Sequence, residues 1–338
     1  MDVVPKAFVC GCEGLALSDD ERRFLTDEQP WGLILFKRNV QSPTQLRALT
    51  AAFREAVGRS EAPVLIDQEG GRVQRLGPPH WPLYPAAAAY ASLTSEAHQI
   101  EAATLGGRLI ASDLRDAGIT VDCAPVLDVP APGSHHVVGN RAFGADPDTV
   151  ARLGRAFANG LLHGGVLPVI KHVPGHGRGM VDSHHDLPVV DATLEELERT
   201  DFRPFIALAD LPAAMTAHVV YSAIDPEQPA TISRIVQDTI IRGALGFTGL
   251  LLSDDLSMQA LKGSLRERAM AAAMAGCDIL LHCNGKLDEA RQVAEAAPRL
   301  AGLAAERASK ALTLIAREPS TATADERSRF EALLDALV

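Results

Sequence analysis

The segment "VLPVIKHVPG", residues 166–175, decides how this chain is expected to fold. It opens with apolar residues, becomes polar at Lys171 and His172, and ends at Pro174 and Gly175. A short apolar run bounded by turn residues is typical of a strand that is buried on both faces of a parallel sheet. The segment therefore predicts a buried strand whose carboxyl end carries polar side chains.

Seven further segments have the same design, so the chain contains eight such runs. The others begin at Ala7, Gly32, Pro63, Ile119, Ala213, Gly249 and Cys277. Between the runs lie stretches with apolar residues at helical spacing. The clearest of these are residues 44–57, 95–117, 149–163 and 266–275. Strands alternating with helices predict an α/β fold, specifically a (β/α)8 TIM-type barrel. A doubly wound open sheet is the alternative, but no G-x-G-x-x-G fingerprint follows the first strand.

The chain of 338 residues has a length that a single barrel commonly reaches. A polar stretch at 320–327 precedes a last amphipathic segment. We therefore expect one catalytic barrel over residues 1–338, with a C-terminal helix at about 328–338 docked on it.

Composition narrows the classes of partner. The chain has 32 basic and 43 acidic residues, a net charge of -11, and no dense Lys/Arg run, so a nucleic-acid partner is not expected. No apolar segment reaches the roughly 18 residues that would cross a bilayer, and the N-terminus does not resemble a secretory signal, so no membrane partner is expected. The 5 cysteines are an odd number and lie mostly in apolar runs, which predicts free thiols and a cytoplasmic location.

Polar residues follow the apolar runs. They are Asp67, Asp128, Lys171, His172, His218, Asp254 and Asn284. In a barrel the carboxyl ends of all strands meet on one face, where enzymes of this architecture carry their active sites. We expect these side chains to gather in a single mouth.

The histidine-rich segment that follows Lys171 raises two alternatives. Zinc needs three or four ligands, and the histidines available are His172, His176, His184 and His185. A helical pair four residues apart would suit a metal, but a proline and a glycine break the segment between the first two histidines. A phosphate-binding loop needs glycines that open a helix, and no helix start follows the glycines here. No metal and no cofactor are therefore expected.

A third interpretation of this segment is an acid/base dyad. In an extended stretch Asp182 and His184 lie on the same side of the backbone. A carboxylate that accepts from one imidazole nitrogen orients the ring and leaves the other nitrogen free to exchange a proton. The glycines before the pair predict a hinged loop that presents it.

Two neighbouring aspartates end the run that begins at Gly249. Successive side chains of a regular strand point to opposite faces, so only one of Asp254 and Asp255 should face the mouth. A carboxylate placed below a sugar ring could attack the anomeric carbon. The residues before the pair are uniformly apolar, so their pattern does not choose between the two.

Taken together, these motifs resemble the family 3 glycoside hydrolases. They are "DQEGGRVQR" (67–75), "GNRAFG" (139–144), "KHVPGHGRGMVDSH" (171–184), "MTAHVVY" (215–221) and "SDDLSM" (253–258). Within this family the chain is similar to the bacterial β-N-acetylhexosaminidases of peptidoglycan recycling. The match runs through nearly the whole chain in the family's order, with two departures: Val173, where the family commonly has Phe, and the additional His185.

The resemblance implies a role for each matching residue. Asp254 would be the nucleophile of a retaining mechanism with a covalent glycosyl-aspartate intermediate, and His184, assisted by Asp182, would be the acid/base. The sugar-binding residues would be Asp67, Arg75, Arg141, Lys171 and His172. The substrate would be a small amino-sugar compound, N-acetylglucosaminyl-anhydro-N-acetylmuramic acid and its peptides, and the protein would be a monomer.

Three other functions remain open from the sequence. Inorganic phosphate could replace water in the second step, because a neutral histidine, unlike a carboxylate base, does not repel it. That reaction would make the protein a phosphorylase with the same dyad. A metal-dependent hydrolase barrel and a sugar-binding barrel without catalysis are the alternatives from other classes.

Overall fold

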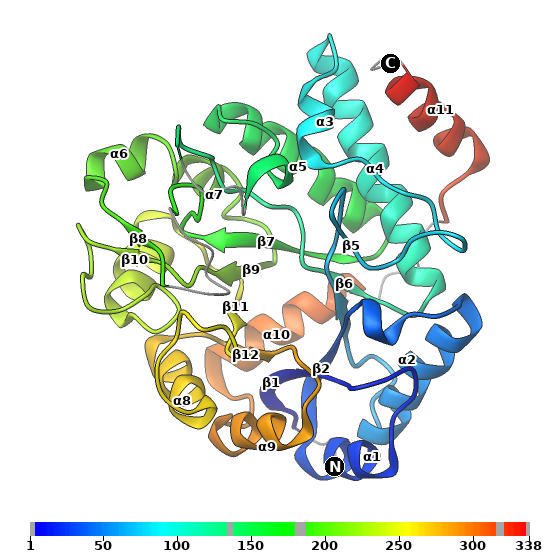
Figure 1. The fold of residues 1–338 in the computed structure, drawn as a ribbon, viewed down its shortest axis with the longest axis vertical. Helices are drawn as coiled ribbons and strands as arrows, with labels where there is room; N and C mark the ends of the chain where they lie inside the picture. Colours follow the sequence, from blue (N-terminus) through cyan, green and yellow to red (C-terminus); the bar gives the residue numbers. More distant parts are fainter. Residues whose placement is uncertain (1–3, 134–137, 180–186, 316–320, 336–338) are drawn as a thin grey trace.

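The computed structural model describes residues 4–133, 138–179, 187–315 and 321–335 (Figure 1). Eight strands form a closed barrel, in the order in which they occur along the chain. They are β1 (Lys6–Gly11), β2 (Pro30–Leu35), β3 (Val64–Ile66), β6 (Val121–Asp122), β7 (Leu167–Val173), β9 (Ala213–Thr216), β11 (Leu250–Asp255) and β12 (Ile279–His282). All eight neighbouring pairs are parallel. The predicted TIM-type barrel is confirmed, and the closure of the sheet excludes the doubly wound alternative.

Helices surround this barrel (Figure 1). They include α1 (Asp19–Glu28), α2 (Pro43–Val57), α3 (Ala87–Ala91), α4 (Glu96–Asp116), α5 (Pro147–His163), α6 (Leu194–Arg199), α7 (Arg203–Ala207), the π-helical segment η3 (Val236–Ala244), α8 (Leu265–Ala275) and α9 (Leu287–Ala296). The four helical stretches expected from the sequence correspond to α2, α4, α5 and α8. In α2, the Ser42 side chain accepts from the Gln45 N–H, Pro43 takes the first turn, and Gly58 ends the helix with φ 62°. These are ordinary start and stop signals, so local sequence accounts for where this helix lies.

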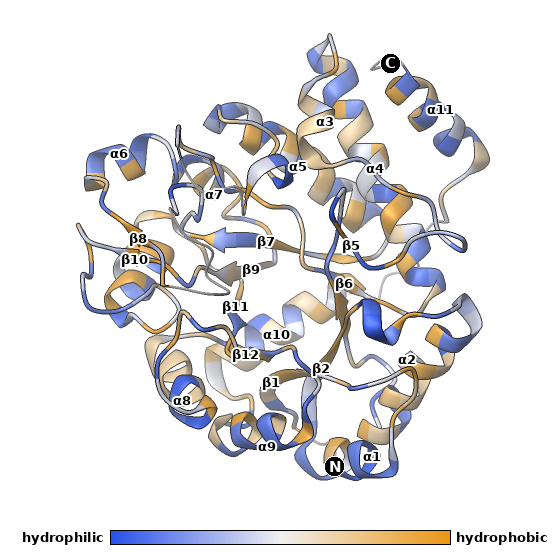
Figure 2. Cartoon of the chain, in the orientation of Figure 1, coloured by the Kyte–Doolittle hydropathy of each residue, from blue (hydrophilic) through white to orange (hydrophobic). Residues whose placement is uncertain are grey.

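The interior of the barrel changes character along its axis. In β7, Leu167 and Val169 belong to the apolar cluster that fills the barrel, and Lys171 is the next residue in that alternation. Helix α10 (Gly302–Ile315) joins the same cluster through Ala308 and Ala311, and so covers the amino-terminal end of the barrel. Figure 2 shows hydrophobic colour along β1 and β2 and hydrophilic colour at the end of β7.

The last described helix, α11 (Ala324–Asp335), packs on α4. The ring of Phe330 lies 6.2 Å from that of Tyr84 and 6.4 Å from that of Tyr90, centroid to centroid. On this packing we propose that residues 1–338 form one domain with the terminal helix docked on the barrel.

All five cysteines are free and buried, as expected for thiols that act as small apolar side chains. Within the described ranges, no helix is both long enough and apolar enough to cross a membrane.

Candidate active site

A pocket of about 340 Å³ lies at the carboxyl-terminal end of the barrel strands, a size within the usual range of ligand sites. Six of the residues nominated from the sequence line it. They are Asp67, Arg75, Arg141, Lys171, His172 and Asp254. The other two, Asp182 and His184, lie outside the described residues, as does His185.

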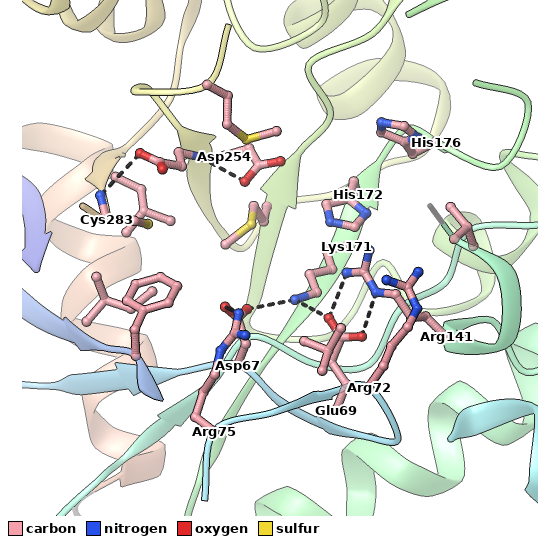
Figure 3. Close-up of a pocket in the computed structure, with 18 residues that line it drawn as sticks. Asp67, Glu69, Arg72, Arg75, Arg141, Lys171, His172, His176, Asp254 and Cys283 are labelled. Atoms are coloured by element: carbon pink, nitrogen blue, oxygen red, sulfur yellow. Dashed lines mark hydrogen bonds and ion pairs between the residues drawn. The ribbon is translucent and has the colours of Figure 1, made fainter. Parts of the chain in front are cut away.

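One wall of the pocket is a network of charges (Figure 3). The Lys171 ammonium lies 2.9 Å from Asp67 Oδ1 and 2.7 Å from Glu69 Oε1. The Arg75 guanidinium donates to the other Asp67 oxygen at 2.9 Å. Arg141 donates to both oxygens of Glu69, at 2.8 and 2.7 Å. Each cation is thereby held in a fixed position on the wall of the pocket.

Electrostatics keep this wall ionised. Burial alone would raise the pKa of Asp67 and of Glu69, but the charges of Lys171 and the two arginines lower both, that of Glu69 to about 2. Burial would lower the pKa of Lys171, but Asp67 and Glu69 raise it. At neutral pH the wall therefore presents paired, fixed charges, a surface suited to the hydroxyl groups of a sugar.

Glu69 was not nominated from the sequence, although its position two residues after Asp67 was a usable signal. The hairpin of β4 (Gln68–Gly70) and β5 (Val73–Gln74) returns the chain so that Arg75 meets Asp67. Its turn is tight: Gly70 has φ 92°, and a Cβ there would lie 2.3 Å from the Pro85 carbonyl oxygen. Only glycine fits that position.

His172 is oriented by Asp128, which is fully buried. Asp128 Oδ2 lies 2.7 Å from His172 Nδ1, and Oδ1 accepts the backbone N–H groups of His172 and His176. A carboxylate only accepts, so Nδ1 carries a proton and Nε2 is left for the pocket. Burial would raise the pKa of Asp128, but His172 and the other donors lower it. From the sequence Asp128 was expected only as a polar strand end, and its partner could not be seen.

Both aspartates of β11 line the pocket, contrary to the alternation expected of a regular strand. The register with β12 shifts between Leu252 and Asp255, and this irregularity accounts for the difference. The two carboxylates have different partners. Asp255 Oδ1 accepts from the N–H groups of Ser257 and Cys283, and its Oδ2 accepts from the Ser257 hydroxyl.

The Asp254 carboxylate accepts fewer hydrogen bonds than that of Asp255 from the residues that the structure describes. Its Oδ1 accepts the N–H of Asp255 at 2.8 Å, and no described residue donates a hydrogen bond to its Oδ2. Burial raises its pKa, but the charges of His218 and His172 and the backbone bond outweigh burial and lower it. Asp254 is therefore ionised at neutral pH and faces the charged wall across the pocket (Figure 3).

Three of the polar strand ends do not belong to the pocket lining, so the expectation that all of them would do so is wrong. Asp128 lies behind His172. His218 is fully buried, with Nε2 2.9 Å from the Asp255 carbonyl oxygen. Asn284 lies beyond Cys283 and donates to Glu289. Strand ends place residues at the same level of the barrel, but the local backbone decides which side chains turn inward.

Apolar side chains also line the pocket. They are Ile34, Phe36, Val73, Val138, Met215, Met258 and Leu281. The Phe36 ring lies 4.9 Å from the Arg38 guanidinium carbon and 5.1 Å from that of Arg75, within cation–π range. A pocket lined by both charged and apolar side chains matches the hydroxyl-bearing edges and the C–H faces of a pyranose. Apolar side chains carry no chemical signal in a sequence, which is why these were missed.

The glycines after β7 serve close packing. A Cβ on Gly177 would lie 1.9 Å from the Val129 carbonyl oxygen, and Gly175 has φ 141°. The Tyr221 hydroxyl donates to the Gly175 carbonyl at 2.6 Å. Within the described part of the chain, no group of three or more His, Cys, Asp or Glu side chains is arranged to hold a metal.

Comparison with known proteins shows which family the chain belongs to. The model of the glycosyl hydrolase family 3 N-terminal domain matches residues 4–317. The chain belongs to glycosyl hydrolase family 3. The β-hexosaminidase of Alkalilimnicola ehrlichii is 43% identical over 279 residues, 81% of this chain and 79% of that protein. The β-hexosaminidase of Methylococcus capsulatus is 44% identical over 275 residues, 80% of each chain.

Solved structures of similar proteins have the same fold. NagZ from Neisseria gonorrhoeae, in complex with N-trifluoroacetyl-D-glucosamine, has a TM-score of 0.88 at 32% identity and covers 99% of both chains. A family 3 β-N-acetylglucosaminidase from Paenibacillus has a TM-score of 0.85 at 31% identity, over 98% of this chain and 67% of that one. This chain is therefore a family 3 glycoside hydrolase.

Proposed function

We propose that the protein is a retaining β-N-acetylglucosaminidase that removes terminal, non-reducing β-linked N-acetylglucosamine from peptidoglycan fragments. The observation that carries the proposal is the Asp254 carboxylate, ionised and with Oδ2 free of hydrogen bonds from the described residues, across the pocket from the charged wall. The relatives named β-hexosaminidase and the NagZ structure with a bound glucosamine derivative support the choice of sugar.

Asp254 is the nucleophile in this proposal. Its oxygen attacks the anomeric carbon, the bond to the leaving oxygen breaks, and a glycosyl-aspartate ester forms. Water then attacks the same carbon from the other side, and the electron pair of the ester bond returns to the Asp254 carboxylate. Two inversions give net retention of the β configuration.

His184 is the acid/base, with Asp182 as its orienting partner. It donates a proton to the leaving oxygen in the first step and accepts one from water in the second. The negative charge of Asp254 favours protonated His184 in the free enzyme, and loss of that charge in the ester favours the base form.

The residues of the charged wall bind the sugar in this proposal. Asp67 can accept from hydroxyl groups, while Arg75, Arg141, Lys171 and His172 can donate to sugar oxygens. The pocket of about 340 Å³ suits a single sugar, which favours action on chain termini.

Trapping of the intermediate tests the mechanism. A fluorinated N-acetylglucosaminyl donor should label the peptide that holds residues 250–258, and fragmentation should place the sugar on Asp254. Asp254→Asn should prevent labelling, and Asp255→Asn, the matched control, should still be labelled. A label on Asp255, or a product of inverted configuration, would contradict the proposal.

Product analysis separates hydrolysis from phosphorolysis. In phosphate buffer the product should be free N-acetylglucosamine, and accumulation of the sugar 1-phosphate would instead identify a phosphorylase. Release of the sugar from anhydro-muropeptides, with and without peptide, tests the substrate class.

The cellular setting belongs to the same proposal. Five free, buried thiols fit a reducing compartment, and we propose the cytoplasm. The monomeric state stays a prediction, and light scattering on the purified protein measures it.

A further inference from the structure

The residues behind Asp254 form a hydrogen-bonded chain that sugar binding does not explain. His218 is fully buried, and its Nε2 lies 2.9 Å from the Asp255 carbonyl oxygen. Its Nδ1 lies 2.7 Å from Thr231 Oγ1, which lies 2.8 Å from Thr216 Oγ1. The Asp254 N–H donates to Thr216 Oγ1 at 3.3 Å. This series of hydrogen bonds therefore begins at the Asp255 carbonyl and ends at the Asp254 N–H.

A count of protons limits the state of His218. The Asp255 carbonyl only accepts, so His218 Nε2 carries a proton. Thr231 has a single hydroxyl proton and three acceptors within reach, which are His218 Nδ1, Thr216 Oγ1 and the Ala217 carbonyl oxygen at 3.1 Å. If the proton goes to Nδ1, the imidazole is neutral. If it goes to Ala217 or to Thr216, then His218 Nδ1 must donate to Thr231, and the ring is a cation.

Two observations favour the cation. The Ala217 carbonyl oxygen accepts no other hydrogen bond from the described residues, so the cationic arrangement satisfies it and the neutral one does not. The Asp254 carboxylate is close enough to His218 to offset part of the cost of a buried charge. The other titratable groups that face Asp254 are Lys171, His172, His176, Cys123 and Cys283.

We infer that His218 is a buried imidazolium that positions the nucleophile: it holds the Asp255 carbonyl directly and the Asp254 N–H through Thr231 and Thr216. This inference rests on the proposed role of Asp254. The positive charge of the His218 imidazolium stabilises the carboxylate form of Asp254. That form exists in the free enzyme and is regenerated when water breaks the ester, so His218 favours the departure of Asp254 in the second step.

Nitrogen-15 NMR of the intact, histidine-labelled enzyme tests the charge without any activity measurement. At pH 7 both ring nitrogens of His218 should have the chemical shift of a protonated nitrogen, with a proton coupled to each. The signal is assigned by its loss in His218→Asn. A His218 nitrogen at the shift of an unprotonated imidazole would overturn the inference.

A matched pair at Thr231 tests the consequence for catalysis. Thr231→Val removes the acceptor of Nδ1 at nearly constant volume, which should leave His218 neutral and raise the pKa of Asp254. The acid limb of kcat/KM should then move to higher pH by about one unit. Thr231→Ser keeps the hydroxyl, and its acid limb should stay where the wild type has it. An unmoved limb in a folded Thr231→Val protein would refute the role of the charge.

The same experiments separate this inference from the proposed function. If Asp254 is not the nucleophile, then trapping fails and Asp254→Asn stays active, whatever the NMR spectrum shows. If only the inference is wrong, then trapping labels Asp254, but His218 has an unprotonated nitrogen.

Discussion

The two ends of the barrel are built from the same strands and differ in almost every physical property. At the amino-terminal end, the side chains of Trp31 and Leu167 pack under Ala308 and Ala311 of α10, and the interior is apolar. At the carboxyl-terminal end, the inward face of β7 continues with Lys171, which is bound to two carboxylates. One strand face thus changes from apolar to charged within two residues.

The apolar end of the barrel, covered by α10, contributes to stability, whereas the charged end, which opens to the pocket, serves ligand binding. We refer to them as the covered end and the open end. Apolar burial at the covered end lowers the free energy of the fold without any need for exact partners. Buried ion pairs at the open end incur a desolvation cost that their mutual attraction only partly repays, so they are weak evidence for stability. Their place at the active-site face of a barrel indicates that they serve ligand binding.

The largest expected effect is at the open end. Asp254→Asn should lower kcat/KM by about 10⁴-fold or more, because an amide does not form the glycosyl ester. Steady-state kinetics on an aryl N-acetylglucosaminide measures this, and the melting temperature should change little. Asp255→Asn is the control; an equal loss of activity in both would show that the two carboxylates are not distinguished as proposed.

Lys171→Met should damage both stability and activity. The substitution leaves Asp67 and Glu69 without their shared cation, which we expect to cost about 3–5 kcal/mol in the free energy of unfolding. Urea titration measures the loss, and kcat/KM should fall as well. Arg307→Met on α10 is the control, since Asp278 keeps its second partner Arg242; a similar loss of activity there would erase the contrast between the two ends.

Ile315→Ala should affect stability alone. Ile315 is 5% exposed and belongs to the cluster at the covered end. Removal of its side chain should cost about 2–4 kcal/mol of unfolding free energy through lost burial and a cavity. At a temperature where the variant is folded, its kcat/KM should equal that of the wild type. A change in kcat/KM would mean that the two ends are coupled.

Acid should destabilise the open end first. The pKa of Glu69 falls from 4.5 to about 2 on folding, so its ionisation stabilises the folded state fully above pH 4.5. That contribution, on the order of 1–2 kcal/mol after allowance for its coupled partners, is lost as the pH falls through 4.5 toward 2. Melting temperatures over this window should fall less steeply in Glu69→Gln than in the wild type, and equal slopes would contradict the assignment.

Strand positions and the long helices could be predicted because they depend on local pattern: each apolar run and each amphipathic stretch carries its own signal. Residues that matched a family motif, such as Asp67, Lys171 and Asp254, line a common pocket, and their roles in the site stay predictions. Glu69 and Asp128 were missed as partners, because an ion pair between distant segments has no local signature. Only one of Asp254 and Asp255 was expected to face the mouth, but both line the pocket, where the register of β11 is shifted.

By itself, the sequence determined that this chain forms eight buried strands alternating with helices, and which polar residues stand at the strand ends. Both follow from periodicity, because burial requires apolar side chains at the intervals of each backbone geometry. Only the tertiary structure decided which charges meet: Lys171 between Asp67 and Glu69, Asp128 behind His172, and His218 beside the two aspartates. Those contacts depend on closure of the barrel and on irregular strand ends, where the position of a side chain is set by neighbours far away in the chain.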